Sequence, residues 1–165
     1  MSIFAGLGSV DPTQGGNYPR PGRYEIKIRS CKKAPSKKNG RIHFVAEYEV
    51  LKAIKTDEKV EPNGVGSNPS WVVNMEGEYP DLALGNVKAF LYAAYGSLMV
   101  SLGEERPSMD QIDEAMGVAA VNEEENPLGG VVLELEAFHK ETQKGSLFTR
   151  TNWGIPARLL NKAAS

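Results

Sequence analysis

Polar and apolar positions alternate with period two in several stretches of the chain. Tyr24, Ile26 and Ile28 alternate with charged residues, and a similar alternation recurs over 42–50, 71–75, 131–137 and 147–155. This period is typical of strands that bury one face. Five strands are therefore predicted, and the pair Asn39-Gly40 predicts a tight turn between the first two.

The period changes after the third predicted strand. Apolar residues then recur at spacings of three and four, as in one face of an amphipathic helix: Leu84, Val87, Leu91, Ala94 and Leu98. Asp81, just after Pro80, is predicted as the N-cap of this helix. Ser108 and Gln111 have capping-box spacing, which predicts a second short helix to about Met116. The last residues, ARLLNKAAS, form a short helix or tail.

This order of elements predicts a mainly β protein. A helix between the third and fourth strands of a five-stranded antiparallel set is the plan of the OB-fold barrel, here with one or two helices at that position. Alternation on every strand fits a small barrel with one wet face. Residues 22–157 are predicted to form this domain. A Gly- and Pro-rich arm (1–21) precedes it, an acidic helical insert covers about 101–127, and a tail (158–165) follows.

Composition narrows the class of protein. The 165 residues fit one domain, and no apolar run of about 18 residues predicts a membrane span. The start, MSIFAGLGSV, has no basic residue and does not resemble a secretory signal. A single cysteine, Cys31, excludes an internal disulfide and suits a reducing compartment. With one cysteine and two histidines, no structural zinc site is expected, and no metal or other cofactor is predicted.

Charge is segregated along the chain, although the formal net charge is only -2. Residues 20–55 include eleven basic and three acidic side chains, whereas residues 101–127 include eight acidic and one basic. Such asymmetry predicts an oriented electrostatic surface. The plainer alternative is that both runs are solvated faces. The acidic segment either is a solvated insert or lies near the basic groove and competes with nucleic acid or docks a partner.

The basic residues fall where an OB-fold binds its ligands. OB-folds bind oligonucleotides or oligosaccharides across strands two and three, between the loop joining strands one and two and the loop joining strands four and five. We therefore predict phosphate contacts from both loops and their flanking strands: Lys27, Arg29, Lys32, Lys33, Lys37, Lys38 and Arg41, with Lys140, Lys144 and Arg150.

Aromatic rings are the second requirement of a single-strand binder, because bases stack on them. The candidates are Trp71, Phe138, Phe148 and Trp153, with His43 as a lesser one. Phe138 and Phe148 fall on the polar faces of their strands, beside Lys140 and Arg150. The alternative is that the tryptophans are core residues, and that the phenylalanines pack under the arm, the acidic segment or a second subunit.

Motifs of catalysis are missing from the chain. There is no phosphate-binding loop and no dinucleotide fingerprint. Glu76, Glu78 and Asp81 are better explained as loop charges and a helix cap than as a metal site. Ser30 and Lys33 match a nucleophile motif by chance, and Cys31 lacks a paired histidine. No catalytic residue is predicted, and the protein is not expected to be an enzyme.

Several stretches together resemble a family of small bacteriophage proteins from replication and recombination gene clusters. They are PGRYEIKIRSCKKAPSKKNGRIHFVAEYEVL, SWVVNM, LALGNVKAFLYAAYG and GGVVLELEAFHKETQKGSLFTRTNWGIP, within residues 19–157. The resemblance implies an OB-fold single-stranded-DNA-binding protein in the cytoplasm of an infected bacterial host. Some single-strand binders end in an acidic tail, whereas this sequence ends NKAAS.

The sequence therefore predicts sequence-tolerant binding of single-stranded DNA in phage DNA replication or recombination. Phage replication or recombination proteins and further copies of the chain are candidate partners, and a membrane is not. Two rival hypotheses remain open. One is a structural or protein-binding β-barrel that does not bind nucleic acid, and the other is an enzyme that acts on nucleic acid.

Overall fold

The computed structural model describes residues 18–164 except 37, 142–144 and 146. In this part of the chain the sheet has five strands: β1 (Gly22–Pro35), β2 (Ile42–Ile54), β3 (Ser70–Asn74), β4 (Val132–Glu141) and β5 (Leu147–Gly154). The helices are α1 (Pro80–Ser101), α2 (Glu114–Ala120) and α3 (Ala157–Ala164), with a short 3-10 turn, η2 (Met109–Gln111). The prediction of a mainly β fold with an antiparallel sheet is confirmed.

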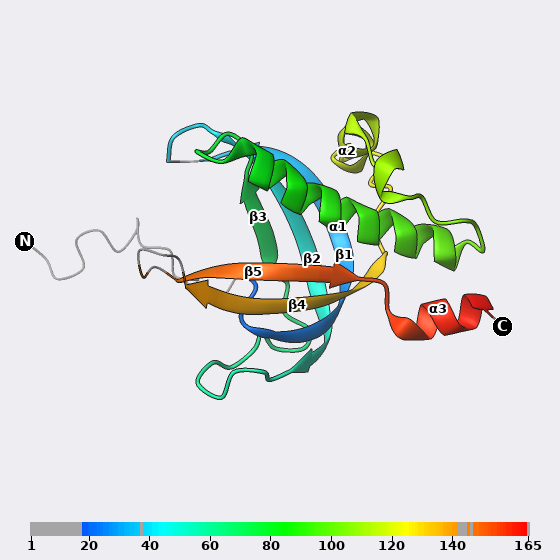
Figure 1. Cartoon of the computed structure of the whole chain (residues 1–165), viewed down its shortest axis with the longest axis horizontal. Coiled ribbons are helices and arrows are strands. Elements are labelled where there is room, and N and C mark those ends of the chain that lie inside the picture. Colours follow the sequence, from blue (N-terminus) through cyan, green and yellow to red (C-terminus); the bar gives the residue numbers. More distant parts are fainter. Residues whose placement is uncertain (1–17, 37, 142–144, 146, 165) are drawn as a thin grey trace, which may run out of the picture.

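The strand order is β3-β2-β1-β4-β5, with every neighbouring pair antiparallel. β1 pairs with β2 along its whole length but with β4 only over Gly22–Lys27. The β1–β2 ladder has two register shifts, one that skips Arg29 of β1 and one that skips Leu51 of β2, and such bulges bend a strand and increase its twist. The sheet consequently curls, and β4 and β5 cross in front of β2 and β3 (Figure 1).

A cluster of aromatic rings fills the core between the edges of the curled sheet. Trp71 on β3 and Trp153 on β5 lie 5.1 Å apart, measured between ring centroids, so side chains join two edge strands that do not pair. Phe90 of α1 is fully buried, at 5.4 Å from Trp71 and 4.9 Å from Trp153. Trp153 meets Trp71 and Phe90 edge to face, and such contacts add to the free energy of burying each ring.

Helix α1 lies over the core, and its start differs from the prediction. Pro80 takes the first helical position and Tyr79 is the N-cap, so the prediction of Asp81 as N-cap is wrong. Asp81 instead lies in the first turn, where its charge favours the helix dipole. At the other end, the Ser97 hydroxyl donates a 2.7 Å hydrogen bond to the carbonyl of Val132 and ties α1 to β4.

The second predicted helix starts later than the capping box suggested. The box is present, since the Ser108 amide donates to Gln111 Oε1 at 2.8 Å, but it opens only the 3-10 turn η2. The helix itself begins at Glu114. Its N-cap is Asp113, whose Oδ1 accepts a hydrogen bond from the Met116 amide at 3.1 Å.

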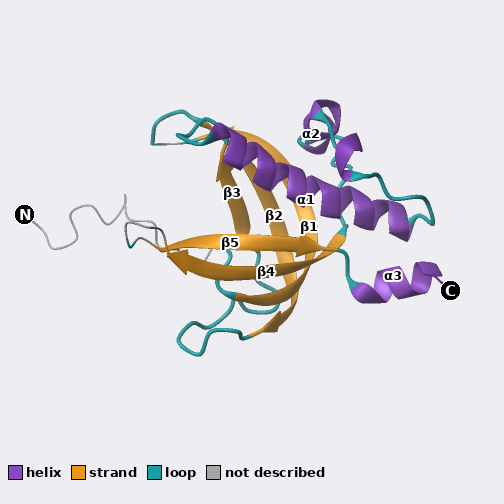
Figure 2. Cartoon of the chain, in the orientation of Figure 1, coloured by secondary structure: helices purple, strands orange, loops and turns teal. Residues whose placement is uncertain are grey.

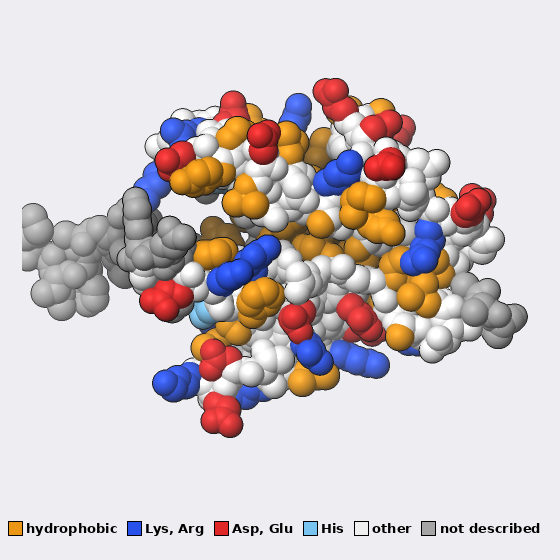
Figure 3. Space-filling view, in the orientation of Figure 1, with side chains coloured by type: hydrophobic (Ala, Val, Ile, Leu, Met, Phe, Trp, Pro, Cys, Tyr) orange, Lys and Arg blue, Asp and Glu red, His pale blue; other side chains and the backbone are white. Residues whose placement is uncertain are grey.

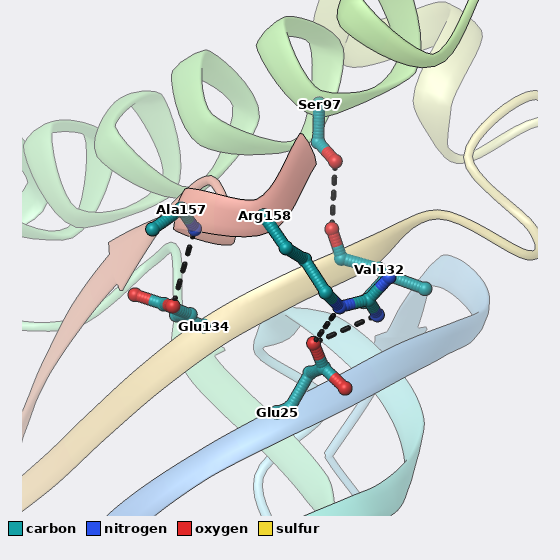
Figure 4. A network of polar contacts seen from close by, with 6 residues as sticks. All are labelled: Glu25, Ser97, Val132, Glu134, Ala157 and Arg158. Carbon is teal, nitrogen blue, oxygen red and sulfur yellow. Dashed lines mark hydrogen bonds and ion pairs between the residues drawn. The ribbon is translucent and has the colours of Figure 1, made fainter. Parts of the chain in front are cut away.

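The C-terminal residues form helix α3, which docks at the end of β5. Arg158 forms an ion pair with Glu25 at 2.8 Å, and the Ala157 amide donates to Glu134 at 3.4 Å (Figure 4). Figure 2 shows α1 and α2 on one side of the sheet and α3 beyond the last strand. Within the described ranges, no helix is long and apolar enough to cross a membrane.

Candidate nucleic-acid interface

The hairpin of β1 and β2 is longer than its turn sequence suggested. Because β1 continues to Pro35, only residues 36–41 form the tip. The tip is closed by hydrogen bonds from the Ser36 amide to the Arg41 carbonyl (2.8 Å) and from the Gly40 amide to the Ser36 carbonyl (2.9 Å). Gly40 has a φ of 72°, a left-handed conformation that glycine adopts without steric cost.

The cations of this hairpin fall into two groups. Lys38 and Arg41 are exposed at the tip, as is Lys33 near the end of β1. Lys32 belongs to the strand and not to a loop, and it pairs with Glu47 at 2.7 Å. Lys37 lies outside the described residues. Lys32 and Lys33 therefore lie on the strand that flanks the loop, and not in the loop itself.

The outer face of β1 is less basic than its own sequence suggests. Lys27 and Arg29 are exposed there. However, Lys27 lies opposite Glu49 of β2, and Lys32 forms an ion pair with Glu47. An acidic row of β2 therefore runs beside the basic row of β1. Neighbouring opposite charges reduce the potential that a phosphate would meet at this face.

Three of the rings proposed as stacking platforms are buried or half-buried. Trp71 is 7% exposed and Trp153 packs in the same ring cluster, so the core alternative fits both tryptophans. His43 is half-buried on the outer face of β2, between Ala34 of β1 and Asn74 of β3. A base would need one open ring face, which Trp71 does not offer here.

The β4–β5 hairpin gathers the remaining predicted residues on one surface. In its register Phe138 lies opposite Arg150, and Lys140 lies opposite Phe148. Directly opposite residues of an antiparallel pair project from the same face, with their Cβ atoms about 5 Å apart. These four residues alternate with buried Leu135 and Ala137 and point away from the core. We call Phe138, Lys140, Phe148 and Arg150 the ribbon face.

The ribbon face is open to solvent. Phe148 is 42% exposed, Lys140 and Arg150 are exposed, and Phe138 is half-buried. Further from the hairpin end the same row changes character, because Glu136 pairs with Arg23 at 2.9 Å and Asn152 lies opposite it. Lys144 lies outside the described residues. Aromatic and basic side chains are thus concentrated towards the free end of the hairpin.

The structure adds one ring that the sequence analysis did not select. Tyr79, the N-cap of α1, is 68% exposed. The segment leading to it is held against the β1–β2 hairpin, because Glu76 accepts a 2.6 Å hydrogen bond from the amide of Ile42. The sequence feature that could have indicated this ring is Pro80. Proline favours the first position of a helix, which places Tyr79 at the N-terminal end of α1. Glu78 and Asp81 flank it, so its surroundings are acidic.

The β1–β2 and β4–β5 hairpins end on the same side of the molecule, at the left of Figure 1. The start of α1 lies beside the first of these ends (Figure 1). Figure 3 shows a group of acidic side chains over α2 at the upper right, and further acidic side chains among the cations at the left. The fold therefore places the acidic insert away from the end of the β4–β5 hairpin, whereas Lys33 of β1 lines one groove with Asp113 and Glu114.

A polar groove of about 620 Å³ lies on the outer face of β1, β4 and β5, next to α3. Its charges are balanced within the groove: Arg23 pairs with Glu136, Arg158 with Glu25, and Glu134 accepts the Ala157 amide. Lys52 adds one further cation. The groove therefore serves to dock α3. Because its charges cancel, it should attract phosphates only weakly.

The lone cysteine does not form a reactive centre. Cys31 is 1% exposed on the inner face of β1, and burial raises the pKa of its thiol to about 12. Thiolate nucleophiles have lowered pKa values and partial exposure. Within the described residues, no group of three or more His, Cys, Asp or Glu side chains could hold a metal ion.

Comparison with known proteins leaves the family open. No protein-family model matches the chain, and a search of curated proteins gave no match. The geometry of the hairpins is consequently the main guide to function.

Proposed function

We propose that the protein binds single-stranded DNA with little sequence preference, without a cofactor and without catalysing a reaction. The observation that carries the proposal is the ribbon face. Two phenylalanines and two cations lie opposite one another on the exposed surface of one hairpin. A base stacked on such a ring contributes roughly 1–3 kcal/mol whatever its identity, because every base has a π face.

The cations beside the rings supply the second half of the interaction. Lys140 and Arg150 can neutralise phosphates of a strand whose bases stack on Phe148 and Phe138. The tip of the β1–β2 hairpin, with Lys33, Lys38 and Arg41, faces the same side of the molecule (Figure 1). A duplex would gain only the phosphate contacts, because its bases are stacked on one another.

We further propose that the fold is an OB-fold barrel closed by side chains. β1 pairs with both β2 and β4, a helix separates β3 from β4, and the edges β3 and β5 meet through Trp71 and Trp153. OB-folds are partly open barrels that bind oligonucleotides between the same two hairpin loops. A role in phage DNA replication or recombination is what the family resemblance adds.

The proposal is tested with labelled oligo-dT of about 30 nucleotides, a length that covers several binding sites of about 4–16 nucleotides per OB-fold. Fluorescence anisotropy is followed over a salt series, with a duplex of equal length as competitor. If the five described cations of the two hairpin ends neutralise five phosphates, log affinity should fall with log salt at a slope of about -3.5. Tryptophan quenching is a poor substitute readout, because Trp71 is buried in the core and the partly buried Trp153 packs against it.

Two outcomes would contradict the proposal. One is no binding at low salt, and the other is displacement by duplex as effective as displacement by unlabelled oligo-dT. The first would favour a protein-binding β-barrel, the alternative for which the structure offers a separate surface between α1 and α2. The second would mean that the protein binds nucleic acid through its phosphates and does not select single strands.

A further inference from the structure

An apolar groove of about 610 Å³ lies between α1, α2 and the adjoining ends of β2 and β3. Its walls include Phe44, Met75, Leu84, Leu91 and Val118. Leu84 is 57% exposed and Val118 is 64% exposed, so both side chains stand open at the groove. Exposed apolar side chains that line one concave surface favour a docking site over a solvated one.

The rim of the groove has a different charge on each side. Asp113 and Glu114 belong to the start of α2, whereas Lys33 belongs to β1 and Lys88 to α1. A well-matched occupant would place an apolar anchor in the groove and direct cations towards α2. Opposite charges across an interface fix the orientation of the partner more than they raise affinity.

The ribbon face has this combination of groups. Phe148 is an exposed ring, and Lys140 and Arg150 are exposed cations on either side of it. Aromatic side chains seated in apolar pockets are common anchors of protein interfaces. Within one chain the contact cannot form, because α1 lies between β5 and α2 (Figure 1). The occupant would therefore be the ribbon of another copy.

We propose that the ribbon face of one copy docks in the α1–α2 groove of the next, with Phe148 as anchor and Lys140 and Arg150 towards Asp113 and Glu114. The two surfaces differ, so the contact is head-to-tail and leads to rings or open chains of copies. If the ribbon face also binds DNA, as proposed above, it cannot bind DNA and the groove of another copy at the same time. Docking then regulates DNA binding, and by linkage DNA must weaken docking to the same degree.

The first experiment follows the mass of the DNA-free protein by sedimentation velocity over a concentration series. The wild type should form dimers and longer species as concentration rises. Val118→Asp should shift this association to concentrations at least about tenfold higher by blocking the groove, and Phe148→Asp should do so by blocking the ribbon. Val65→Asp, which changes an exposed valine in a distant loop, is the matched control and should behave as wild type.

Mixing the two blocked variants makes the test specific for a head-to-tail contact. Val118→Asp keeps an intact ribbon and Phe148→Asp keeps an intact groove, so an equimolar mixture has one functional contact. It should form 1:1 dimers and no longer species. Longer species in the mixture, or wild-type association by Val118→Asp alone, would overturn the proposal. So would a wild type that stays monomeric up to about 1 mM, which would leave the groove to another kind of partner.

DNA separates this inference from the proposed function. Oligo-dT added to the associated wild-type protein should dissociate it into monomers. The Val118→Asp variant, at a concentration where it is monomeric, should bind oligo-dT with wild-type affinity. Association that persists on saturating oligo-dT would overturn the regulatory part. Association in a protein that binds no DNA would refute the proposed function and leave the docking contact standing.

Discussion

The two faces of β5 differ in what their aromatic residues do. Trp153 points inward and packs 5.1 Å from Trp71 and 4.9 Å from Phe90, while Phe148 on the opposite face is 42% exposed beside exposed Arg150. Successive strand residues point to opposite sides, so the two rings lie on opposite faces of β5, one covered by the core and the other open to solvent.

The two faces of β1 repeat this contrast in its polar chemistry. Cys31 is buried inward, and burial raises the pKa of its thiol to about 12, whereas Arg29 and Lys27 are exposed outward. The inner face is therefore inert and the outer face charged. Because one strand serves both purposes, substitutions on opposite faces should separate stability from binding.

The largest effect is expected from Trp71→Ala. This change removes a buried ring that contacts Phe44, Phe90 and Trp153 and joins the two sheet edges. Loss of such a ring typically costs about 3–5 kcal/mol of unfolding free energy, measured by urea denaturation. A loss below about 1 kcal/mol would show that the edges are held by other contacts.

Phe148→Ala should lower DNA affinity and leave stability almost unchanged. Oligo-dT affinity is expected to fall about fivefold to about 150-fold, in line with about 1–3 kcal/mol for one stacked base. Unfolding free energy should change by less than about 0.5 kcal/mol, because the ring is exposed. Phe148→Tyr keeps a flat ring and should retain affinity, while Phe148→Leu should not. Equal affinity in all three variants would remove Phe148 from the interface.

Reversing charge at the β1–β2 tip should alter salt dependence more than specificity. Lys38→Glu with Arg41→Glu removes two phosphate contacts, so the slope of log affinity against log salt should become shallower by about 1.4. The matched control, Lys52→Glu with Lys59→Glu, makes the same change in net charge at exposed lysines outside the two hairpin ends. Similar slopes in both double variants would mean that only overall charge matters.

Sequence patterns predicted the elements of this fold well, because alternation and helical spacing record which side chains are buried. They also placed Phe138 and Phe148 on the polar faces of their strands, where the structure has them. The pairing of Phe138 with Arg150 follows from register, which depends on the hairpin loop and could not be read from periodicity.

Other features depended on contacts between distant segments. The ion pair of Lys32 with Glu47 forms only once β1 and β2 pair, so the basic stretch looked stronger in sequence than it is on the outer face. Trp71 and Trp153 could not be assigned to core or surface, since strand parity leaves open whether a face is covered. Tyr79 could not be identified as an exposed ring from the sequence, because its exposure at the start of α1 depends on where the helix packs.

The smallest effect is expected in the pH dependence of stability that the buried Cys31 thiol on the inner face of β1 causes. The pKa of the Cys31 thiol is raised from 9.0 in the absence of the fold to about 12, so the unfolded chain loses the thiol proton at lower pH than the folded one. The associated stability is fully present below about pH 9 and falls as pH rises towards 12. Relative to Cys31→Ala, the wild type should therefore lose about 1.4 kcal/mol between pH 8 and pH 10. The comparison uses urea denaturation of both proteins. The ionisation of Tyr24 and Tyr48 affects both proteins alike, whereas the charge of the Cys31 thiolate contributes to the raised pKa of Tyr95. Parallel curves would mean that the thiol ionises as readily in the folded chain, and that the inner face of β1 is more accessible than its burial indicates.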